Sequence, residues 1–161
     1  MLNDLVDPGL LAEMASASEQ KLSRAAELVS RQTLTHKSFR IRLLAEDKID
    51  GRFDSGNVFV RFAIQPGVLQ LVTLILGGFP LLTDVLLTLS RETSSELSYS
   101  QLWHRDHDDP RTVKLFVYLT DVKEREDGPF TFFPKPISDA FGFSLHSHVP
   151  DDKVFRYVDQ K

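Results

Sequence analysis

The chain contains no cysteine. A disulfide framework, a thiolate metal site and a thiol nucleophile are therefore excluded, and any transition metal must be held by histidine, aspartate or glutamate. An excess of basic charge is also absent, because the formal net charge is -4. Duplex nucleic acid is normally bound by a basic patch that replaces counterions, so we expect no nucleic-acid partner.

Long uninterrupted apolar runs are absent as well. The most apolar stretch, residues 67–90, is broken by Gly77, Gly78, Pro80, Thr83 and Asp84, so we expect no membrane span. The N-terminus is acidic and has neither the apolar segment nor the cleavage site of a secretory signal. These features predict a soluble, cytoplasmic protein, while its oligomeric state stays open.

The 161 residues, of which 42% are hydrophobic and 26% charged, fit one domain with an apolar core. Its first part is predicted to be helical. Asp7 before Pro8 is a plausible N-cap, and apolar residues at helical spacing follow between 22 and 29. Residues 66–75 begin with proline and end before two glycines, which predicts a buried helix. Residues 32–64 give only a weak pattern.

From residue 82 onward, apolar and polar residues alternate as they do in strands. Four strands are predicted, at residues 85–89, 98–106, 112–120 and 129–133. Helices followed by strands indicate an α+β fold, here a double-stranded β-helix (jelly roll, cupin-like) with N-terminal helices packed on one face. The predicted parts are helical support at 1–80, early jelly-roll strands with a metal motif at 81–134, and a loop and helical insert at 135–161.

The run WHRDHDD, residues 103–109, gathers the side chains most suited to chemistry. Residues two apart in a strand share a face, so His104 and Asp106 would project together. Trp103 and Arg105 would point away. An imidazole and a carboxylate suit a divalent ion, and a further histidine would complete the two-histidine, one-carboxylate site of non-haem Fe(II) oxygenases. Judged on spacing alone, a solvated loop is the favoured interpretation and the metal site the alternative.

The longer run LSYSQLWHRDHDDPRTVKLFVYLTDVKEREDGPFTFFP, residues 97–134, resembles the metal strand and the next two strands of the phytanoyl-CoA dioxygenase family. Besides His-x-Asp, the matches are a Trp before the His, a Lys in the next strand, a Tyr-Leu-Thr-Asp-Val strand end and a following Gly-Pro. The resemblance implies Fe(II) and 2-oxoglutarate as cofactors, a small-molecule substrate, and His104 and Asp106 as iron ligands. His107 and Asp108 match nothing functional and are interpreted as solvated.

Lys114 lies in the strand predicted next, where relatives often place a polar side chain that contacts the keto acid. Alternation would place it on one face with Phe116 and Tyr118. If that face lines the barrel, the Lys114 ammonium can pair with a carboxylate of 2-oxoglutarate. The alternative is a surface lysine. Trp103 is interpreted as a core residue.

The resemblance also implies a distal iron histidine and, shortly after it, an arginine that binds the keto acid. Both belong on late strands, and no such strand is evident here. Of the two downstream histidines, His146 and His148, neither has the expected context. For His148 a loop histidine is the favoured interpretation and a distal ligand the alternative.

The sequence therefore predicts an Fe(II)- and 2-oxoglutarate-dependent dioxygenase whose jelly roll is incomplete at the C-terminus. On this interpretation the 161-residue chain is an inactive N-terminal fragment. Two alternatives stay open: a non-catalytic or degenerate jelly-roll binding protein, and a cupin-type metal-dependent isomerase or hydrolase.

Overall fold

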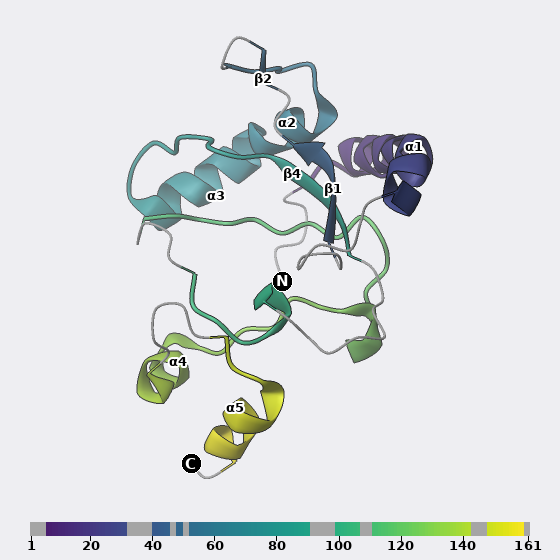
Figure 1. Cartoon of the computed structure of the whole chain (residues 1–161). Coiled ribbons are helices and arrows are strands. Elements are labelled where there is room, and N and C mark those ends of the chain that lie inside the picture. The colour runs from purple at the N-terminus through teal and green to yellow at the C-terminus, as the bar shows by residue number, and fades with distance from the viewer. Residues whose placement is uncertain are drawn as a thin grey trace. The chain divides into compact units, whose positions relative to one another are not determined.

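The computed structural model (Figure 1) describes residues 6–31, 40–45, 48–49, 52–90, 99–106, 111–142 and 148–159. The described residues form two compact units. The first unit takes those within 1–33, 40–91 and 111–121, and the second takes those within 92–110 and 122–161. Each unit has apolar contacts of its own and is described by itself.

Helix α1 (Pro8–Arg31) opens the first unit. The Asp7 carboxylate accepts a hydrogen bond from the Leu10 N–H at 3.0 Å. The Asp7 carbonyl accepts another from the Leu11 N–H, also at 3.0 Å. The predicted N-cap and the proline in the first turn are therefore confirmed. Leu10 and Met14, one turn apart, are buried in the core.

Helix α2 (Val58–Ala63) begins at a cap that the sequence prediction missed. The Asn57 side-chain oxygen accepts hydrogen bonds from the N–H groups of Phe59, at 2.9 Å, and Val60, at 3.4 Å. Two of the N–H groups that a helix start leaves unpaired are thereby satisfied.

Helix α3 (Pro66–Leu76) confirms the helix predicted at 66–75. It ends at Gly77, which has a left-handed φ of 69°. Glycine adopts this conformation readily because it has no Cβ to clash with the backbone. The prediction that this helix is buried is wrong. Leu74 is 74% exposed and Ile75 60% exposed, and only its start, at Val68, is buried.

The strands of the first unit are short. Strand β1 (Arg40–Ala45) pairs antiparallel with β4 (Leu86–Ser90), and β2 (Lys48–Ile49) pairs antiparallel with β3 (Arg52–Phe53). Strand β4 confirms the first predicted strand. The core of the unit joins α1, α2, α3 and β4 through six buried residues: Leu10, Met14, Phe59, Phe62, Val68 and Leu87.

The strands predicted at 98–106, 112–120 and 129–133 do not appear in the described parts of those segments. Tyr99–Gln101 is the 3-10 helix η1, and residues 112–118 and 129–133 have no ladder partner. Alternation predicts faces, but a strand also needs a neighbour for its N–H and C=O groups. Helices with two antiparallel strand pairs fit the α+β class.

In the second unit, helix α4 (Lys135–Phe141) and helix α5 (Asp151–Val158) follow the 3-10 helix η2 (Arg125–Asp127). Helices α4 and α5 lie within residues 135–161, where the sequence predicts a loop and helical insert. Figure 1 shows α4 and α5 near each other, and the Phe141 and Tyr157 rings meet edge to face at 5.1 Å. Val154 of α5 is 1% exposed. No described helix has the length and apolarity that crossing a bilayer requires.

Candidate metal site

The side chains of His104 and Asp106 converge in the second unit. Nε2 of His104 lies 3.4 Å from Oδ1 of Asp106. The His104 side chain is 27% exposed and that of Asp106 56% exposed. Although residues 104–106 lie in no ladder, they have the same-side arrangement that a spacing of two residues predicts.

The alternate residues point elsewhere and are held by the helices. The Trp103 indole stacks on Phe133, with ring centroids 4.3 Å apart. Nη2 of Arg105 donates to Oδ1 of Asp139, in α4, at 2.7 Å. Hydrogen bonds from Lys135 and from Arg105 lower the pKa of Asp139. Trp103 thus packs on Phe133, but it is only partly buried and does not belong to the buried core that the sequence predicts for it.

A backbone carbonyl determines which nitrogen of His104 faces Asp106. Nδ1 lies 2.7 Å from the Leu102 C=O, and because a carbonyl only accepts, Nδ1 carries the hydrogen. Nε2 then offers either a lone pair or, in the imidazolium, a second N–H. A lone pair on Nε2 can share a metal ion with the carboxylate, and an N–H there can donate to it.

The spacing of the two donors fits a first-row divalent ion. Donors about 2.1 Å from one ion stand about 3.4 Å apart at a tetrahedral angle and about 3.0 Å apart at a right angle. The separation of 3.4 Å between His104 Nε2 and Asp106 Oδ1 matches the first value. Octahedral coordination would need the two atoms about 0.4 Å closer, which is within reach of a side-chain rotation.

His148 lies beside this pair. Its ring centroid is 5.4 Å from that of His104, and the two ring planes are 27° apart. The cause is the antiparallel bridge between Trp103 and Val149. That register puts residue 148 opposite residue 104, in a position where side chains share a face. Sequence reasoning favoured a loop role for His148, because such a contact depends on pairing between distant segments.

These three side chains do not yet form a complete set of metal ligands in the structure. The described part of the chain contains no group of three His, Asp or Glu side chains arranged to hold a metal ion. Two nearly parallel imidazoles present faces to each other, whereas their lone pairs lie in the ring planes. His104 and Asp106 therefore converge, and His148 would have to turn its ring to join them.

Lys114 belongs to the first unit and is exposed. The predicted alternation of faces holds only in part: Val117 and Leu119 pack against the core and Phe116 and Tyr118 are 56% and 47% exposed, but Leu115, on the same predicted face as Val117, is 43% exposed. Its contact with 2-oxoglutarate stays a prediction. His107, Asp108 and His146 lie outside the described residues.

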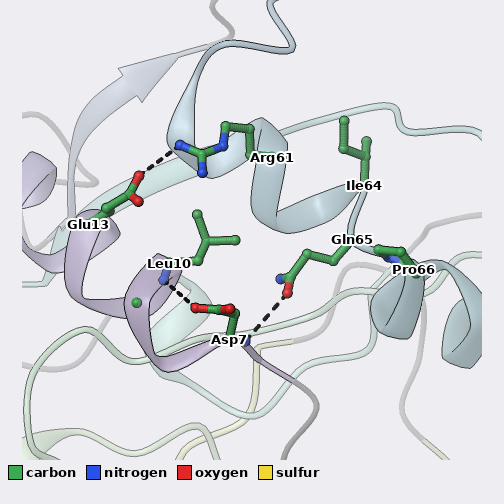
Figure 2. A pocket seen from close by; sticks show the side chains of 8 residues that line it. Asp7, Leu10, Glu13, Arg61, Ile64, Gln65 and Pro66 are labelled. Carbon is green, nitrogen blue, oxygen red and sulfur yellow. Dashed lines mark hydrogen bonds and ion pairs between the residues drawn. The ribbon is translucent and has the colours of Figure 1, made fainter.

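A separate open hollow of about 480 Å³ lies between the start of α1 and the α2–α3 junction (Figure 2). Its polar groups bind one another: Arg61 pairs with Glu13 at 2.7 Å, and the Asp7 N–H donates to Gln65 Oε1 at 3.5 Å. These bonds fasten α1 to the next two helices, which is a structural role. Sequence reasoning singled out no function here. The lining residues are Asp7, Gly9, Leu10, Glu13, Arg61, Ile64, Gln65 and Pro66.

No protein-family model matches the chain, and no curated protein or solved structure is significantly similar to it.

Proposed function

We propose that the chain carries the metal-binding segment of an Fe(II)- and 2-oxoglutarate-dependent oxygenase of the phytanoyl-CoA dioxygenase type. The observation that carries the proposal is the 3.4 Å approach of His104 Nε2 to Asp106 Oδ1. The resemblance of residues 97–134 to that family supports iron and a keto acid over other cofactors. The same resemblance supports a jelly roll as the fold of the whole oxygenase and a small molecule as its substrate.

Each neighbouring group has a role in this proposal. The Leu102 carbonyl holds the Nδ1–H tautomer of His104, so that Nε2 presents its lone pair. The Asp106 carboxylate partly neutralises a divalent charge. His148 turns from its stacked position to become the third ligand. By the family resemblance alone, Lys114 is the candidate to pair with a carboxylate of the keto acid.

Three protein ligands leave open positions on the metal for a keto acid and O2. Bound Fe(II) and 2-oxoglutarate would supply oxidative decarboxylation of the keto acid coupled to hydroxylation of a substrate C–H bond.

The test compares Co(II) binding and Fe(II)-dependent succinate release by the purified chain and its variants. We expect one Co(II) per chain and loss of binding in His104→Ala and in His148→Ala, while His146→Ala serves as the matched histidine control. Succinate release without added substrate would further support an oxygenase. A chain that binds no Co(II), or one whose binding survives His104→Ala, contradicts the proposal.

A second candidate is a non-catalytic or degenerate relative. It is favoured by the absence of a ready three-ligand group among the described residues. A protonated His104 already forms an ion pair with Asp106 without any metal. Co(II) binding with no Fe(II)-dependent succinate release, even in the presence of candidate substrates, would favour this reading of the site.

A further inference from the structure

Trp103 joins the segment that carries His104 to the segment that carries His148. Its N–H donates to the Val149 carbonyl at 3.0 Å, and its own carbonyl accepts from the Val149 N–H at 2.8 Å. Two residues that exchange both bonds lie directly opposite each other in an antiparallel pair. Their neighbours, His104 and His148, are then opposed on one face, where side chains approach most closely.

This register decides whether the two imidazoles meet. A slip of one residue turns every side chain of a strand to its other face. His104 would then lie opposite residue 147 or residue 149 and lose its partner. The bridge is an isolated one, and two neutral backbone hydrogen bonds alone hold a register weakly.

The Trp103 side chain supplies the further attachment. Nε1 of the indole donates to Oδ1 of Asp151, the first residue of α5, at 2.7 Å. A hydrogen bond to a carboxylate is stronger than one between neutral groups, and Asp151 lies where the helix dipole favours negative charge. The indole also meets Phe155, one turn further along α5, edge to face at 5.9 Å. The Trp103 side chain is thus bonded to Asp151, two residues after Val149, as well as to Val149 through its backbone.

We infer that Trp103 and Asp151 are positioning residues: their hydrogen bond locks Trp103 opposite Val149 and so holds His104 opposite His148. We call this hydrogen bond the register lock. It positions the histidine pair of the proposed metal site, and its effect on metal binding rests on that proposed function. Neither residue touches the metal. Both act through the placement of the two imidazoles.

The absence of cysteine from the chain allows a direct test of the register. His104→Cys with His148→Cys places two thiols at opposed positions, whose Cβ separation of about 4.5–5.5 Å approaches what a disulfide needs. His104→Cys with Val149→Cys reports a slip by one residue. Both pairs are oxidised with oxidised glutathione, and the ratio of the two cross-linking rates is measured.

We expect the 104/148 pair to cross-link about tenfold faster than the 104/149 pair. Trp103→Phe, which keeps a stacking ring but lacks the indole N–H, should bring that ratio close to one. Asp151→Ala should do the same, and the double variant should be no worse than either alone. Asp151→Asn keeps an acceptor oxygen without the charge and should give a ratio between those of Asp151→Ala and the parent, which a general loss of stability would not explain.

The same substitutions are then made with both histidines intact, and Co(II) is titrated. Trp103→Phe and Asp151→Ala should raise the Co(II) dissociation constant about tenfold, and Asp151→Asn should raise it by less. A parent ratio near one, or a ratio that Trp103→Phe leaves unchanged, overturns the register lock. A ratio that depends on Trp103 in a chain that binds no Co(II) supports the lock and overturns the proposed function instead.

Discussion

Replacement of Asp106 by asparagine tests whether this residue is a metal ligand or only one partner of a surface ion pair. At 3.4 Å, two unit charges in water attract by about 1.2 kcal/mol. Asp106 is 56% exposed, and the attraction exists only while His104 is protonated. We therefore expect Asp106→Asn to lower the free energy of unfolding of the metal-free chain by less than about 1 kcal/mol.

Metal binding should respond far more strongly. Loss of an outer-shell partner already weakens metal sites by about 10–100-fold, so loss of a ligand should raise the Co(II) dissociation constant by more than about 100-fold. That factor corresponds to about 2.7 kcal/mol. Urea denaturation measures the first quantity, and titration calorimetry measures the second.

Asp152→Asn is the matched control. Asp152 pairs with Arg156 at 3.3 Å, and its side chain is 64% exposed. Its loss should cost as little stability as that of Asp106 and should leave Co(II) binding unchanged. The reasoning is refuted if Asp106→Asn costs several kcal/mol of stability while the Co(II) affinity stays within about twofold of wild type.

Three further predictions concern the cap, an ion pair and the keto acid. Asn57→Ala removes the oxygen that accepts from the first N–H groups of α2 and should cost about 1 kcal/mol in urea denaturation. The pKa of Asp139 is lowered by Lys135 and Arg105, so this carboxylate stabilises the fold above the ordinary aspartate range and loses that effect as pH falls through its lowered pKa. The stability difference between wild type and Asp139→Asn should therefore vanish at acid pH, and a difference that grows there would refute the assignment. Lys114→Met should raise the dissociation constant of 2-oxoglutarate for the Co(II)-loaded chain and leave Co(II) affinity unchanged; equal 2-oxoglutarate binding curves would exclude the contact.

Local features of the fold were predictable because their causes lie within a few residues. Asp7 caps α1 through the N–H three residues on, and Gly77 ends α3 by its own φ. Asn57 is an equally local cap, but the surrounding residues 32–64 give only a weak sequence pattern. Exposure was harder to predict than helix formation. The apolar composition of α3 suggests burial, whereas Leu74 is 74% exposed.

Non-local features were the ones that the sequence left open. Alternation at 112–120 predicts which side chains share a face, and Val117 and Leu119 do pack on the core. It carries no information on a pairing partner, and no ladder forms there in the described chain. The convergence of His104 and Asp106 follows from their spacing alone. The approach of His148 depends on the bridge at Trp103, between segments that are far apart in sequence.

The central claim is that His104 Nε2 and Asp106 Oδ1 share one metal ion. Its most direct test is a long-range proton–nitrogen NMR spectrum of the chain labelled with nitrogen-15 in histidine, recorded during titration with diamagnetic Zn(II). We predict that one equivalent of Zn(II) shifts the Nε2 resonance of His104, and that Asp106→Asn abolishes this shift. Nδ1 should stay protonated and keep its hydrogen bond to the Leu102 carbonyl. An unchanged Nε2 resonance at saturating Zn(II), or coordination through Nδ1, would contradict the account.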